Sequence, residues 1–148
     1  MDGAARLEYF ATAPRIKVNN MPNGFQGSEL EWQRIEAPLL RVDSTLEMFA
    51  SAHGLAISKN YHNHPERSLT WGTGLRRLIQ LYLADSRLLT FNIWLCASQD
   101  RGSSRYWKQE FLFKEQSIDI FFSTLPSLLS EAYRKLDSWT AEDLERAG

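Results

Sequence analysis

The amino-acid sequence predicts a single α+β domain, in which an antiparallel sheet of about four to six strands carries a C-terminal helix and one earlier helix on its apolar face. Three observations support this prediction. Residues 75–114 alternate between apolar and polar side chains with the period of two that strands show, and two turn signals divide them. Residues 121–139 place apolar side chains at helical spacing. A chain of 148 residues with 43% hydrophobic and 24% charged residues is ordinary for one globular domain.

The first part of the chain, residues 1–38, is predicted to be an irregular N-terminal segment that precedes an α+β domain of residues 39–148. Pro14, Pro22 and Pro38 punctuate it, together with several Asn and Gly residues. Residues 15–18 and 30–35 each alternate weakly between apolar and polar. Two interpretations stay open: a β-hairpin that covers the sheet, or an arm that lies over the domain.

An early helix is predicted to follow Ser44. Ser44 and Glu47 have the spacing of a capping box, and Gly54 falls where a left-handed residue ends a helix. A helix of about ten residues is marginal on its own, so it must be held by packing. Further strands are expected at residues 55–57 and 68–71.

The central strands are expected around residues 75–84, 88–98 and 105–114, joined by turns at 85–87 and 99–103. Odd-numbered side chains are assigned to the core. The residues expected on the core face are Ile79, Leu81, Leu83, Phe91, Ile93, Leu95, Trp107, Phe111 and Phe113. The residues singled out on the opposite, aromatic-polar face are Arg76, Gln80, Tyr82, Asn92, Trp94, Tyr106 and Lys108.

A terminal helix is predicted to cover the core face. It is expected to begin near Ser123, because this start places Pro126 in the first turn, where proline is tolerated. Its apolar side chains would then lie against the odd-numbered residues of the strands.

Composition restricts the location and the partners. The formal net charge of −1 argues against a general nucleic-acid binder. The single cysteine, Cys96, cannot form an intramolecular disulfide, which favours a reducing compartment. The opening residues lack the apolar stretch of a signal peptide, and no apolar run approaches the roughly 20 residues that span a bilayer. We therefore expect a cytoplasmic protein that has no membrane partner.

One short motif suggests metal chemistry. His62-Asn63-His64-Pro65 is similar to the His-x-His-Pro string of the JAMM metalloproteases, in which both histidines bind the metal. That family adds an Asp ligand downstream, whereas residues 65–84 contain no Asp. The alternative is an exposed polar turn. The sequence thus predicts no metal site and no cofactor, with His62 and His64 as the only metal candidates.

The aromatic-polar face supplies the leading functional hypothesis. Tyr82, Trp94 and Tyr106 among Arg and Asn side chains resemble the composition of protein interfaces. We expect a non-enzymatic bacterial binding protein, of immunity or adaptor type, whose partner is another protein. Two alternatives stay open. The first is an enzyme or binding protein for a small molecule, with a pocket between the sheet and the N-terminal segment. The second is nucleic-acid binding through a basic-aromatic cluster around Arg76 and Lys108.

Overall fold

The described residues form an α+β fold, as predicted, with two α-helices and a sheet of six antiparallel strands. The computed structural model describes residues 21–61, 65–85 and 90–147. The elements, in chain order, are α2 (Glu29–His53), β2 (Ala56–Asn60), β3 (Glu66–Trp71), β4 (Arg76–Asp85), β5 (Thr90–Arg101), β6 (Ser104–Ser117), α3 (Ile118–Ser138), a 3-10 turn (Ala141–Asp143) and β7 (Glu145–Arg146).

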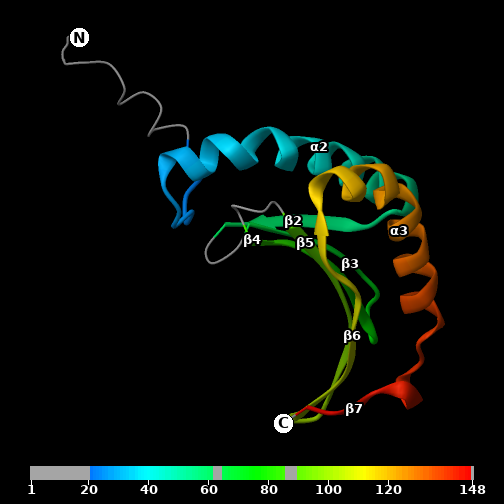
Figure 1. Ribbon diagram of the computed structural model, residues 1–148. Coiled ribbons are helices and arrows are strands. Elements are labelled where there is room, and N and C mark those ends of the chain that lie inside the picture. Colours follow the sequence, from blue (N-terminus) through cyan, green and yellow to red (C-terminus); the bar gives the residue numbers. More distant parts are fainter. Residues whose placement is uncertain (1–20, 62–64, 86–89, 148) are drawn as a thin grey trace.

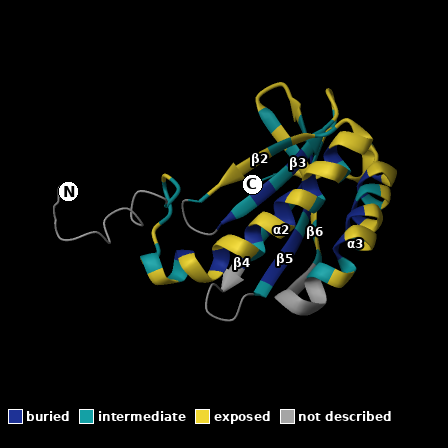
Figure 2. Ribbon diagram, turned by 90° about the horizontal axis from the view of Figure 1, so that it is seen from above, coloured by how far each residue is buried: buried dark blue, intermediate teal, exposed yellow. Residues whose placement is uncertain are grey.

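The sheet is a simple meander that bends strongly along its strands. Each strand pairs with the next one in the chain, in the order β2-β3-β4-β5-β6-β7. Seen from the side, the strands form an arc, and both helices lie outside this arc, on its convex face (Figure 1). Viewed from above, buried and exposed residues alternate along both helices, as amphipathic packing requires (Figure 2). The core therefore lies between the helices and the convex face.

Helix α2 begins earlier than the sequence suggested. Its capping box is formed by Ser28 and Glu31, so the predicted start near Ser44 is wrong, although Gly54 ends the helix in a left-handed conformation as predicted (φ 68°). Residues 30–35 are helical, so the alternative of a hairpin strand there is also wrong, and the expected boundary at residue 38 falls inside α2. Trp32 and Ile35 are buried before Pro38, and Leu39 is buried after it. Their packing compensates for the hydrogen bond that a proline removes.

The predicted faces of the sheet hold for β4 and β5 but fail for β6. The core residues of β4 and β5, from Ile79 to Leu95, are at most 2% exposed, which confirms their assignment. In β6, by contrast, Phe113 pairs with Ile93 and Phe111 pairs with Trp94, so Leu112 has no counterpart on β5. This β-bulge exchanges the two faces for residues 104–111, the part of β6 that precedes it.

The bulge overturns four assignments. Trp107 and Phe111, expected in the core, are 36% and 39% exposed. Tyr106 and Lys108, expected on the open face, lie on the convex side instead: Tyr106 packs against the core, and the Lys108 ammonium lies 4.6 Å from the ring centre of Trp139. The side chain of Phe113 lies outside the described part of the structure.

Helix α3 covers the convex face of the sheet, as predicted, but begins at Ile118 instead of near Ser123, so Pro126 lies in its interior. Leu125, Leu129 and Leu136 are buried along it. Arg77 is a charged, odd-numbered residue of β4, so its side chain leaves the sheet on the same face as the core residues. Its guanidinium donates to the carbonyl oxygens of Leu136 (2.9 Å) and Trp139 (2.8 Å), which holds the end of α3 against the sheet.

A buried ion pair joins α2 to the sheet. Arg67 of β3 and Asp43 of α2 are 2% and 5% exposed. The Arg67 guanidinium donates two hydrogen bonds to the Asp43 carboxylate and one, of 2.8 Å, to the Tyr61 hydroxyl. The described helices include none that is long and apolar enough to cross a membrane.

Candidate functional site

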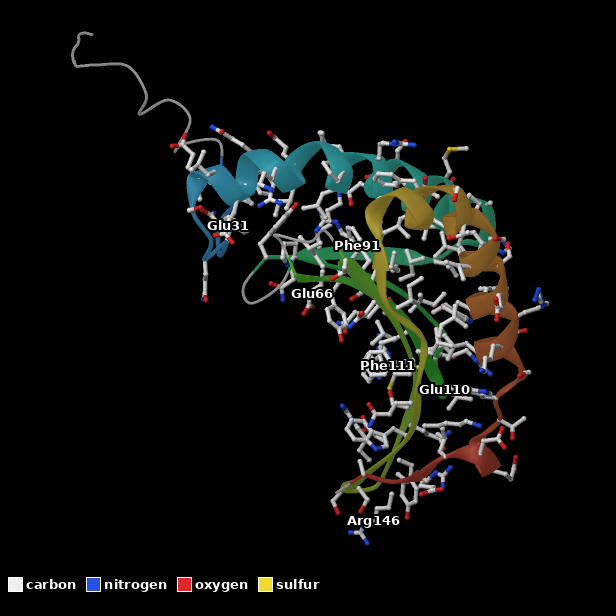
Figure 3. The ribbon with its side chains drawn as sticks, viewed as in Figure 1. Glu31, Glu66, Phe91, Glu110, Phe111 and Arg146 are labelled. Carbon is white, nitrogen blue, oxygen red and sulfur yellow. The ribbon has the colours of Figure 1, made fainter. Side chains whose placement is uncertain are left out.

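The concave face of the sheet carries aromatic and polar side chains that point away from both helices. Strand pairing brings them together, because Gln80, Trp94 and Phe111 lie side by side on β4, β5 and β6. Figure 3 shows Glu66 and Phe111 inside the arc of the sheet, whereas Glu110 points toward α3, where it accepts a hydrogen bond from Lys135. Trp94, in the middle of this row, is half-buried.

Two adjoining hollows occupy the concave face, and Trp94 borders both. The first, which we term the aromatic hollow, has a volume of about 340 Å³. Its lining consists of Glu66, Gln80, Tyr82, Trp94 and Phe111. Side chains around it hold each other in place: the Gln80 amide donates to Glu66 (3.2 Å), and the Asn92 amide donates to the Tyr82 hydroxyl (3.0 Å). The polar part of this hollow is therefore already ordered by its own hydrogen bonds.

The second hollow, which we term the arginine hollow, has a volume of about 250 Å³ and a basic rim. Its lining consists of Thr70, Arg76, Arg77, Leu78, Trp94, Cys96, Ser98, Arg105 and Trp107. Arg76 is exposed, and Arg105 is 59% exposed while its Nε donates to Asp100 (3.0 Å). Both guanidinium groups line this hollow together with the rings of Trp94 and Trp107. The hollow can therefore bind a ligand that carries an apolar group next to an anionic group.

Cys96 lies at the floor of the arginine hollow and is 7% exposed. Burial raises the pKa of the Cys96 thiol, and the positive charge of Arg105 partly opposes this shift by lowering it. A raised pKa keeps the thiol protonated at neutral pH, and a protonated thiol is a poor nucleophile. The geometry thus favours Cys96 as part of the lining, as expected for a filler residue in a strand.

Five of the seven predicted binding residues lie on the concave face. They are Arg76, Gln80, Tyr82, Asn92 and Trp94. Tyr106 and Lys108 are on the convex side, where the Lys108 ammonium lies 4.6 Å from the ring centre of Trp139. The basic-aromatic cluster that motivated the nucleic-acid alternative is therefore divided, with Arg76 on the concave face and Lys108 on the convex side.

The residues of the concave face that sequence reasoning did not assign to it include Arg105, Trp107 and Phe111, all on β6. A signal for this error was present. Phe111, Leu112 and Phe113 are three consecutive apolar residues in a strand that otherwise alternates, and strict alternation cannot place all three on one face. Such a run is compatible with a β-bulge. The sequence does not indicate whether the residues before the bulge or those after it have exchanged faces.

The remaining candidate positions concern metal binding and the N-terminal segment. His62 and His64 lie outside the described residues, so their metal role stays untested. Within the ranges 21–61, 65–85 and 90–147, no group of three or more His, Cys, Asp or Glu residues could hold a metal ion. The N-terminal segment was expected to cover the aromatic-polar face of the sheet. Its described part, residues 21–38, does not cover the concave face, because it runs along the helix side of the sheet (Figure 1).

Comparisons with known proteins find no significant match for this chain among family models, curated proteins or solved structures. The site itself must therefore carry the functional argument.

Proposed function

We propose that this chain is a non-enzymatic binding protein that holds a segment of another protein against the concave face of its sheet. The observation that carries this proposal is the row formed by Trp94, Phe111 and Trp107. These large rings border two hollows on a face from which both helices are absent. Exposed apolar patches are uncommon on monomers, and where they occur they often mark interaction sites.

The composition of the face also supports protein binding. Aromatic residues and arginine are enriched at the centres of protein interfaces, and the concave face combines both with hydrogen-bonding Gln and Asn side chains. The internal hydrogen bonds of Gln80 and Asn92 reduce the entropy lost on binding, since these groups are ordered before a partner arrives. By analogy with other small α+β domains, a bacterial cytoplasmic adaptor or immunity-type protein fits this description.

The experiment compares two variants of the concave face with one of the convex side. Trp94→Asp and Phe111→Asp place a charge in the middle of the face, whereas Met48→Asp changes an apolar side chain on α2 that is 73% exposed and belongs to neither hollow. Each tagged protein is used for quantitative affinity purification from native lysate. We expect proteins that bind the wild type and Met48→Asp to be lost from both concave-face variants. If every partner is retained by Trp94→Asp and Phe111→Asp, the concave face is not the binding surface.

The volumes of the hollows favour a second candidate, which is binding of a small molecule. At about 340 and 250 Å³, the hollows lie near the lower limit for ligand pockets, and both are open to solvent. They lie on the concave face, whereas residues 29–38, which belong to the expected N-terminal segment, are part of α2 on the opposite side of the sheet. A metabolite library screened by Trp fluorescence checks this function: hits that bind the wild type but not Trp94→Asp would favour it over protein binding.

A further inference from the structure

We propose that the occupant of the concave face is an amphipathic α-helix of another protein, with its apolar side on Trp94 and Phe111 and with acidic residues facing Arg76 and Arg105. This inference rests on the proposed function, that the concave face binds protein, and adds the secondary structure and the charge of the bound segment.

The shape of the sheet defines the direction in which a ligand lies. The bend runs along the strands, so the concave face is a trough whose axis crosses the strands (Figure 1). The hollows are lined by residues of β3, β4, β5 and β6. Four strands at about 4.8 Å spacing give a trough roughly 14 Å long. A cylindrical segment fits such a trough along its axis, whereas a flat sheet would contact only its two rims.

An α-helix has the dimensions that this trough requires. About ten helical residues, which make almost three turns, extend over roughly 15 Å. Over this length a helix places apolar residues at positions i, i+3, i+4 and i+7 along one side, which suffices to contact Trp94 on β5 together with Trp107 and Phe111 on β6.

Other occupants fit the structure less well. An added strand needs a regular free edge, but β2 has only five residues, with Lys59 among them, and β6 is interrupted by register shifts near Leu112 and beyond. Short, charged and bulged edges oppose strand addition. A second copy of the chain, docked through the same face, would bring two concave surfaces together and leave the hollows between them unfilled.

The charge of the occupant follows from the rim of the arginine hollow. Arg76 and Arg105 border this hollow, and its described lining residues include no carboxylate; the Asp100 carboxylate, outside the lining, accepts one hydrogen bond from Arg105 Nε (3.0 Å). In the aromatic hollow, the lining includes the acidic residue Glu66. Its carboxylate already accepts a hydrogen bond from Gln80. Acidic residues on the side of the helix that faces the arginine hollow would therefore gain charge-assisted hydrogen bonds, whereas basic residues there would be repelled.

The test is a selection from a displayed library of random 16-residue peptides. The full-length wild-type protein is the target, and the library is first depleted on the Trp94→Asp variant to remove peptides that bind elsewhere. We expect the enriched sequences to show apolar residues at helical spacing and an excess of Asp and Glu. We further expect a selected peptide to gain helical circular dichroism on binding, to bind Met48→Asp as tightly as the wild type, and to bind Arg76→Glu/Arg105→Glu at least about tenfold more weakly.

The outcomes separate the inference from the function on which it rests. Peptides that depend on Trp94 but alternate as strands do, or are basic, would overturn the helix inference and leave protein binding in place. If a selected peptide binds Arg76→Glu/Arg105→Glu as tightly as the wild type, the charge assignment fails. If no enriched peptide distinguishes the wild type from Trp94→Asp, both the inference and the proposed function fail. Thermal unfolding of each variant checks that the fold is retained.

Discussion

Arg76 and Arg77 show how one residue step separates the two faces of this sheet. They are neighbours on β4, so their side chains leave opposite faces. Arg76 reaches the rim of the arginine hollow, and Arg77 binds the carbonyl groups at the end of α3. The alternation along the strand predicted that these two side chains leave opposite faces, whereas the partners of Arg77 at the end of α3 became visible only in the structure.

Exchanging each arginine for methionine should separate these roles. Arg77→Met removes two hydrogen bonds from a charged donor and should lower the free energy of unfolding by roughly 2 kcal/mol. Arg76→Met should change it by less than about 0.5 kcal/mol, because the side chain is exposed. Urea unfolding measures both values. Equal losses for the two variants would contradict the assignment of Arg77 to the α3 terminus.

Cys96 gives a pH-dependent prediction. Because burial raises the pKa of its thiol, the native protein binds this proton more tightly than the unfolded chain does. The stabilising contribution is thus complete below the ordinary cysteine pKa of about 8.5 and is lost as the pH rises above it. We expect the wild type to lose more stability than Cys96→Ala between neutral and strongly alkaline pH in urea unfolding. Parallel losses in the two proteins would contradict a raised pKa.

Alkylation of the same thiol measures its environment directly. Cys96 should react with iodoacetamide more slowly in the native protein than in the urea-unfolded chain at the same pH. Arg105→Gln should slow the native reaction further, because the positive charge of Arg105 lowers the pKa of the thiol.

At the scale of single elements, β6 limits what the sequence could predict. Regular alternation sufficed to assign the faces of β4 and β5, and their pairing is nearly regular. In β6 the unpaired Leu112 reverses the alternation, and whether a strand bulges depends on its partner strand, which local pattern does not contain. Hence Trp107 and Phe111 were assigned to the core, although they are on the concave face.

The bulge predicts an unequal response at two adjacent positions. Leu112 packs against the core, so Leu112→Asp should lower the free energy of unfolding by at least about 2 kcal/mol. Phe111→Asp should cost clearly less, because 39% of that residue is in contact with water. Chemical unfolding of both variants is the measurement. The reverse order would mean that β6 alternates without the bulge.

The helices were harder to delimit than the strands, for a related reason. Pro38 and Pro126 were both taken as signs of a boundary, yet both lie inside helices. A proline removes one hydrogen bond, and the buried residues on either side of it provide tertiary packing that propensity does not include. The apolar positions of both helices were visible in the sequence, whereas their first residues were not.

The ion pair between α2 and β3 should be costly to break from one side. Arg67→Met leaves the Asp43 carboxylate buried, with Lys59 3.5 Å away as its remaining cation, and we expect a loss of about 3–5 kcal/mol in the free energy of unfolding. In Asp43→Leu/Arg67→Met no unpaired charge remains, so this double variant should regain much of the loss. A double variant that is no more stable than Arg67→Met would contradict this explanation.

At the scale of the whole molecule, α2 and α3 stabilise the convex side of the sheet, while Trp107 and Phe111 on the concave side are 36% and 39% exposed among the described residues. Exposed rings promote self-association. Trp107→Ser/Phe111→Ser should therefore lower light scattering at high protein concentration without a large change in the unfolding midpoint. Unchanged scattering, or a fold lost in the double variant, would mean that these rings are more deeply packed than their exposure indicates.

The short strand β7 has a practical consequence. The backbone N–H of Ala147 donates to the carbonyl of Arg105 (2.8 Å), so residues 145–147 are held next to the rim of the arginine hollow. A dye attached at residue 147 would lie near a ligand bound at that rim and could report binding by a change in brightness. A bulky group attached at this position would instead obstruct access, so bait proteins for interaction screens are better tethered at another position.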